Sequence, residues 1–221
     1  MDIERYSQYN ESFNRLCTFK IGICSGFFSE YNNIILAMAY CLLHRIRFQL
    51  TSNDANFNRI RGWQGCFLPF CHEGLDSKKH YRTWDYRYAL KRIVFQLDFS
   101  SIASLYPYLF PWKKRLRTQD IFGKCRNKHQ KDSLFRILEL GFEGNFQQLC
   151  AELVNMTWHY NVETEDRIFR IIQTLNLPAH YVSIHVRRGD KIVEANHTSL
   201  SQYMDKLGEK CRNLFVATDD Y

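Results

Sequence analysis

The densest group of side chains able to do chemistry lies in the run His185-Val186-Arg187-Arg188-Gly189-Asp190-Lys191. Because arginine offers a rigid fork of donors and lysine a point charge, this run suits a diphosphate ligand. Neighbouring side chains at a strand end point in opposite directions, so one arginine can face a ligand while the other pairs with Asp190. An ordinary salt-bridged loop is the alternative, and an integrin-type Arg-Gly-Asp tripeptide is a weaker one.

The elements that must position this run have the pattern of a βαβ unit. The stretch 181–186 is rich in β-branched residues and alternates in polarity, which predicts a strand. A charged loop over 187–196 follows, and Ser199 or Leu200 opens a helix predicted to reach about Cys211. A second buried strand is predicted over 214–217. Two strands have too little core to stand alone, so the unit either extends another sheet or opens a longer domain.

A first α/β pattern lies near the N-terminus. A strand is predicted over 19–24, then a polar turn over 25–31, and then a helix over 33–44 with Asn32 as its cap. The next strand is predicted over 46–50. Ligands of such sheets bind at the carboxyl ends of the strands, which indicates the 25–31 turn.

The middle of the chain, residues 55–131, is aromatic, basic and irregular. Its rings predict a surface that binds sugars, which would be the acceptor side of a sugar-transferring enzyme, with core packing as the alternative for any single ring. Further helices are predicted over 84–98, 133–139, 147–156 and 163–175, the last with Thr164 as its cap. The basic run from residue 113 to 131 is compatible with binding of an anion, and an ordinary solvated face is the alternative.

Composition limits the possible classes of protein. The chain has 221 residues, 45% apolar, and a formal charge of +7, which predicts a folded protein with an anionic partner. Zinc-finger spacing and aromatic RNA motifs are missing, so no nucleic-acid partner is expected. No membrane span is predicted, and the eight scattered cysteines fit free thiols of a reducing compartment. Cys66, Cys71 and His72 approach zinc spacing but lack a second pair.

The run 185–191 closely resembles the His-Val-Arg-Arg-x-Asp-Lys signature of the α1,6-fucosyltransferase family. That family includes the enzyme that fucosylates the core of N-glycans and the nodulation-factor fucosyltransferases. Glu194-Ala195, His197 and Tyr203-Met204 follow in the family's order, with a loop before Glu194 that is shorter by about two residues. The run 215–220 then resembles the family's next motif, an apolar strand ending in Ala-Thr-Asp-Asp. The resemblance covers residues 181–221.

This resemblance implies an α/β fold of the GT-B type, in which two Rossmann-like domains face a cleft. Residues 1–176 would form the acceptor-side domain, and residues 177–221 would begin a GDP-fucose-binding domain that is incomplete in this chain. The implied enzyme is an inverting fucosyltransferase without metal or other cofactor. Its partners would be GDP-fucose as the donor and an oligosaccharide or glycan as the acceptor.

The chemistry of that reaction assigns roles to the residues of the two motifs. Fixed cations stabilise the charge that develops on the departing GDP, and a general base accepts the proton of the attacking hydroxyl. Glu194 is the predicted base on the family's Glu-Ala match, and Asp190, Asp219 and Asp220 are reserve candidates. The predicted catalytic residues are Arg188, Glu194, Lys191 and Asp190. The predicted donor-binding residues are His185, Arg187, Arg188, Asp219 and Asp220. An Asp219–Asp220 metal pair is an alternative that lacks a third carboxylate.

Two other functions remain open on sequence grounds. An α1,2-fucosyltransferase carries a similar His-x-Arg-Arg-Gly-Asp signature, although Lys191 and the later Glu-Ala-x-His order favour the α1,6 type. A glycan- or nucleotide-binding relative without catalysis is the second alternative. The absence of a signal anchor predicts a cytoplasmic enzyme of the bacterial type, and a Golgi-lumen origin is the alternative if the chain is an N-terminally truncated fragment.

Overall fold

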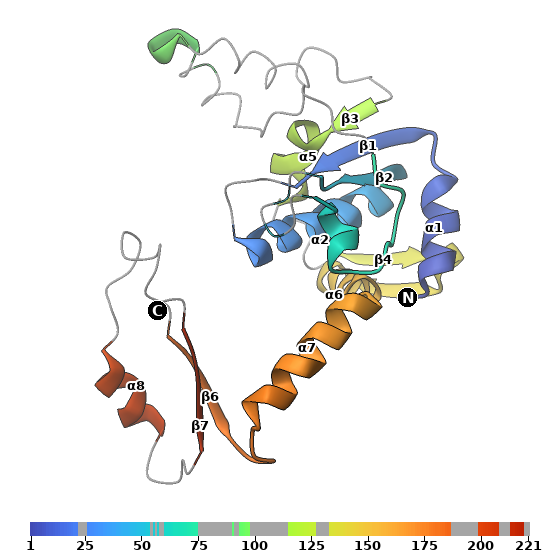
Figure 1. Ribbon diagram of the computed structural model, residues 1–221. Helices are drawn as coiled ribbons and strands as arrows, with labels where there is room; N and C mark the ends of the chain where they lie inside the picture. Colours follow the sequence, from blue (N-terminus) through green and yellow to red (C-terminus); the bar gives the residue numbers. More distant parts are fainter. Residues whose placement is uncertain are drawn as a thin grey trace. The chain divides into compact units, whose positions relative to one another are not determined.

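The computed structural model describes residues 1–21, 26–53, 55, 57, 60–74, 90, 93–97, 115–126, 133–186, 199–207 and 213–218. The chain divides into two compact units, Met1–Thr164 and Glu165–Tyr221. Figure 1 shows the helices and strands of both units. Their content is mixed α/β, as the sequence predicts.

The first unit is organised around a parallel sheet of three strands, β1 (Arg15–Lys20), β2 (Ile46–Thr51) and β3 (Arg115–Arg117), in the order β2-β1-β3. The prediction for β2 is confirmed, whereas the predicted strand over 19–24 is wrong in its bounds. The strand begins at Arg15 because the alternating residues Cys17 and Phe19 are buried, and each pairs in register with β2.

Helix α2 (Phe27–Leu43) connects β1 to β2 and contributes most of its length to the core. It begins at Phe27 after Gly26, so the predicted start at Asn33 with an Asn32 cap is wrong. Asn33 lies inside the helix and is buried, and its side-chain oxygen accepts hydrogen bonds from the Arg126 guanidinium at 2.7 and 3.2 Å. Asn33, the predicted first residue of the helix, is therefore an internal anchor within it.

A hairpin replaces the helix predicted over 133–139. Strand β4 (Leu134–Ile137) pairs antiparallel with β5 (Phe142–Asn145), and a short 3-10 turn, η4 (Leu138–Leu140), connects them. Gly141 ends the turn with a φ of 62°, a conformation that few other residues adopt. Helix α6 (Phe146–Thr157) follows and confirms the prediction for 147–156. Its Asn145 cap accepts from the Gln148 amide at 2.9 Å.

The outer side of β2 contacts two other segments. Asn10, on helix α1 (Ile3–Glu11), is buried, and its side chain bonds both backbone groups of Phe48. Its carbonyl oxygen accepts from the Phe48 amide at 2.7 Å and its amide donates to the Phe48 carbonyl at 2.9 Å. Two residues after Phe48 on β2, the Leu50 carbonyl accepts a hydrogen bond from the Gly74 amide at 2.6 Å. These bonds attach α1 and the 60–74 segment to the sheet.

The second unit contains a βαβ arrangement. Strand β6 (Val182–Val186) pairs in parallel with β7 (Leu214–Thr218), and helix α8 (Leu200–Leu207) lies between them in the chain. The predictions of both strands and of the helix between them are confirmed, although the described helix ends at Leu207. Among the described helices, none has the length and apolar character needed to span a bilayer.

Helix α7 (Val162–Leu175) confirms the helix predicted over 163–175. The predicted Thr164 cap is wrong, because Asn161 accepts a hydrogen bond from the Thr164 amide at 2.9 Å and so caps the helix itself. The predicted domain boundary follows this helix at residue 176, whereas the second compact unit begins within its first turn.

Candidate functional site

The carboxyl edge of the β6–β7 pair is where the two sequence motifs begin. Val186 is paired with Thr218, so the last described residues of the two motifs are direct neighbours in register. His185, one predicted donor-binding residue, lies on β6 opposite Ala217, and its side chain is exposed. The other predicted site residues lie outside the described part of the chain, namely Arg187, Arg188, Asp190, Lys191, Glu194, Asp219 and Asp220.

The alternation of β6 separates His185 from its neighbour Val186. Val186 is buried, with 6% of its surface exposed, so its side chain belongs to the packed face of the strand. His185 is on the opposite face, since successive side chains of a strand point to opposite sides. At the other end of the pair, the Tyr181 and Phe215 rings meet edge to face at 6.3 Å. These contacts fix the β6–β7 register, and with it the positions from which both motifs continue.

A second polar cluster lies at the carboxyl end of β2, and no sequence motif indicates it. The Ser52 hydroxyl donates to the Glu73 carboxylate at 2.5 Å and accepts from the Trp63 amide at 2.7 Å. Burial raises the pKa of the Glu73 carboxyl, and hydrogen bonds from Ser52 and Gln64 partly offset that effect. Because Ser52 is only 1% exposed, this cluster fastens the 60–74 segment to β2.

We expect the Glu73→Gln substitution to change how stability depends on pH. A carboxyl whose pKa is raised by folding favours the folded state most when protonated, and this contribution is lost as pH rises from 4.5 through the folded pKa. The glutamine variant lacks this loss, so its melting temperature should increase relative to the wild type as pH rises. Scanning calorimetry between pH 4 and pH 8 measures the difference.

Glu143→Gln is the control for removing one surface carboxylate, since Glu143 is exposed and lies 3.5 Å from Arg136. A difference in melting temperature between Glu73→Gln and the wild type that stays constant across this range would contradict the raised pKa of Glu73.

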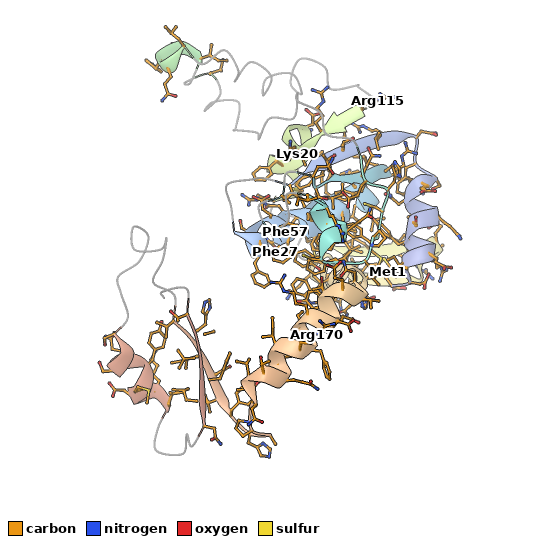
Figure 2. All side chains as sticks on the ribbon, viewed as in Figure 1. Met1, Lys20, Phe27, Phe57, Arg115 and Arg170 are labelled. Atoms are coloured by element: carbon orange, nitrogen blue, oxygen red, sulfur yellow. The ribbon has the colours of Figure 1, made fainter. Side chains whose placement is uncertain are left out.

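The predicted ligand turn over 25–31 is largely helical, because residues 27–31 form the beginning of α2. Instead of a polar turn, this part of the chain carries an aromatic cluster. Phe27 stacks on Phe67 at 5.6 Å and meets Phe57 edge to face at 4.9 Å, and Figure 2 shows Phe27 and Phe57 close together. Phe28 stacks on Trp158 at 5.9 Å with an interplanar angle of 13°.

The exposed fraction of the rings in this cluster increases from the core to the surface. Trp63 and Phe67 stack at 4.3 Å and are 1% and 5% exposed, whereas Phe28 is 72% exposed. Trp158 and Tyr160 lie between these extremes. The most exposed described ring of this cluster, Phe28, thus lies on α2 and not in the 55–131 region, for which the acceptor-facing surface stays a prediction.

The described cysteines are free thiols, and three of them, Cys17, Cys41 and Cys125, are buried. Burial raises the pKa of Cys71 to about 12 and that of Cys125 to about 12, so both thiols are protonated at neutral pH. Within the described ranges, no three His, Cys, Asp or Glu side chains gather to hold a metal ion.

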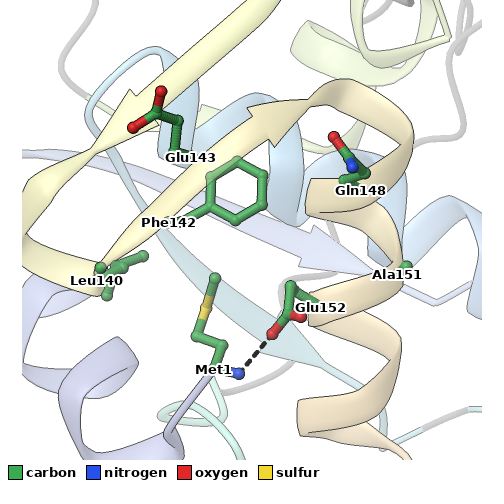
Figure 3. A pocket seen from close by; sticks show the side chains of 8 residues that line it. Met1, Leu140, Phe142, Glu143, Gln148, Ala151 and Glu152 are labelled. Carbon is green, nitrogen blue, oxygen red and sulfur yellow. Dashed lines mark hydrogen bonds and ion pairs between the residues drawn. The ribbon is translucent and has the colours of Figure 1, made fainter.

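A cavity of about 380 Å³ lies between the hairpin and α6 (Figure 3). The Met1 amine and the Glu152 carboxylate pair there at 2.5 Å, and Glu143 adds a second carboxylate. This lining does not suit a diphosphate, because it carries two acidic side chains. Its lining residues are Met1, Leu140, Gly141, Phe142, Glu143, Gln148, Ala151 and Glu152.

No family model and no curated protein matches this chain. The likeness to the fucosyltransferase motifs therefore rests on the residues of 181–221 alone and stays a prediction.

Proposed function

We propose that this protein transfers L-fucose from GDP-fucose to a glycan acceptor with inversion, as an enzyme of the α1,6 type. The observation that carries the proposal is the parallel pairing of β6 with β7, in which Val186 lies opposite Thr218. The basic motif and the Asp-Asp motif thus follow neighbouring strands at one carboxyl edge. Ligands of parallel α/β sheets bind outside that edge.

The basic motif has the chemistry that departure of GDP requires. The bond between fucose C1 and the β-phosphate oxygen breaks, and its electron pair stays on that oxygen. Arg187 and Arg188 would neutralise the charge that develops there, with Lys191 assisting. Cations fixed at this position stabilise the transition state more than the ground state, and that difference accelerates the reaction.

The acceptor hydroxyl oxygen forms the new bond to C1 from the opposite face, which gives inversion. Glu194 would accept the proton of that hydroxyl, with Asp190 as the first reserve. His185, exposed on β6, would bind the donor together with Asp219 and Asp220. This scheme requires no metal ion.

Release of GDP from GDP-fucose by the purified protein tests the proposal, with and without a glycan acceptor and with EDTA present. We expect GDP release from GDP-fucose that an acceptor accelerates and EDTA leaves unchanged, and no release of UDP from UDP-galactose. Binding of GDP-fucose without turnover would contradict transfer and support a non-catalytic binding protein. Failure to bind GDP-fucose would overturn both. The linkage in the product, read by NMR, separates the α1,6 from the α1,2 reaction.

A further inference from the structure

Phe28 is an exposed ring that the structure holds in a fixed orientation. It lies in the first turn of α2, is 72% exposed, and stacks on Trp158 within 13° of parallel. Trp158 in turn meets Tyr31 and Phe67 edge to face at 5.1 and 5.3 Å. Because the buried rings hold Trp158, a ligand that stacks on Phe28 finds a surface that is already ordered.

Polar groups accompany this apolar face. Among the described residues, neither the Trp158 indole N–H nor the Tyr160 hydroxyl has a hydrogen-bond partner, although Trp158 and Tyr160 lie within 5.9 Å of each other by ring centroid. Trp158 and Tyr160 are half-buried, and neither group is among the buried polar atoms without a partner, so both groups reach the surface. The surface thus combines a flat apolar plate with hydrogen-bonding groups, which matches a sugar ring with its C–H face and its hydroxyls.

An ion pair joins the two segments that carry Trp63 and Tyr160, and it favours a neutral ligand. Arg61 precedes Trp63 in the chain, Glu163 follows Tyr160, and their side chains pair at 3.0 Å. Each charge of this exposed pair is balanced by the other, so the pair offers no unbalanced charge to an anion such as a nucleotide or to a cation. A neutral carbohydrate fits this surface, because it carries neither a positive nor a negative charge.

We propose that Phe28, supported by Trp158 and Tyr160, stacks against a pyranose ring of a neutral oligosaccharide. The assignment of this aromatic surface to the acceptor glycan rests on the transferase function proposed above. The best ligand is a β-linked sugar whose hydroxyls are all equatorial, because such a ring presents flat C–H faces to an aromatic plate.

Isothermal titration of the full chain with a tetrasaccharide of β1,4-linked glucose, without GDP-fucose, tests this surface. We expect the Phe28→Ala and Phe28→Leu variants to raise Kd about fivefold to tenfold, since each loses one stacked ring. Trp158→Phe keeps a ring but loses the N–H, and a smaller rise is expected. Phe169→Ala is the matched control, because Phe169 is an exposed ring on α7, and its Kd should equal that of the wild type.

The inference is overturned if no tetrasaccharide binds, or if Phe28→Ala and Phe28→Leu bind it as the wild type does. It is also overturned if Phe28→Ala changes only the sedimentation coefficient, which would make the surface an interface between copies of the chain. If the protein turns over GDP-fucose but does not bind the tetrasaccharide through Phe28, the sugar-stacking inference fails and the transferase proposal stands. Phe28-dependent binding by a protein that ignores GDP-fucose would remove the transferase proposal and the acceptor assignment, and leave a sugar-binding site.

Discussion

The Arg188→Ala variant is expected to release GDP from GDP-fucose about 100-fold to 1000-fold more slowly than the wild type. Removing one donor that stabilises developing charge typically costs about 2.7–4 kcal/mol in the transition state, and Arg188 is the residue proposed to supply it. The loss should appear in kcat, since the charge develops as the bond breaks. Steady-state measurement of GDP release gives kcat and KM separately.

Two further variants make this result specific. Arg188→Lys keeps the charge but loses the two-pronged guanidinium, so it should also be slow. Arg136→Ala removes an exposed arginine of β4 that pairs with Glu143, and its kcat should match the wild type. Near-normal turnover by Arg188→Ala or Arg188→Lys, with circular dichroism unchanged, would refute the role assigned to Arg188.

A second large effect is expected on stability, for Gly62→Ala. Gly62 has a φ of 57° and is buried, and a Cβ atom there would lie 2.1 Å from the Ser52 hydroxyl and 2.7 Å from the Ser52 backbone carbonyl. The left-handed conformation costs alanine about 1–2 kcal/mol, and overpacking adds about 1–3 kcal/mol. We expect the free energy of unfolding to fall by about 3 kcal/mol or more, measured by urea titration.

Gly123→Ala is the matched control for this substitution. Gly123 is in helix α5 (Thr118–Cys125), and no atom lies within 4 Å of the position its Cβ would take. Alanine there should stabilise the protein by about 0.5–1 kcal/mol, because glycine is a poor helix former. Equal effects of the two substitutions would mean that the contact between Gly62 and Ser52 does not constrain the fold.

The βαβ unit could be predicted from sequence because its strands are short, apolar and close together. Residues 182–186 and 214–218 are separated by one helix, so local patterns determine which strands pair. The same holds for α6, whose Asn145 cap is a local signal. The contribution of residues 115–117 was missed because their backbone pairs with β1, nearly a hundred residues earlier, while two of their three side chains are basic.

The Ser52–Glu73–Trp63 cluster could not be predicted for a similar reason. Ser52 follows β2, Trp63 lies in the 3-10 helix Gly62–Gly65, and Glu73 forms a bridge with Leu50. No local pattern links these positions, so only the folded chain brings them within hydrogen-bonding distance. The hairpin over 134–145 depends on the left-handed Gly141, and a short apolar run before it reads equally well as a helix. The exposed ring of Phe28 belongs to helix α2, which begins at Phe27, before the predicted start at Asn33.

The hydrogen bonds that Asn10 and Gly74 make to β2 also occupy polar groups at the border of the described sheet. A strand at the border of a sheet normally offers a row of unpaired amides and carbonyls to any extended chain that meets it. On β2 the groups of Phe48 are occupied by a side chain, and the Leu50 carbonyl by Gly74. An invading strand would have to displace both, so this border resists the edge-to-edge association that leads to fibrils.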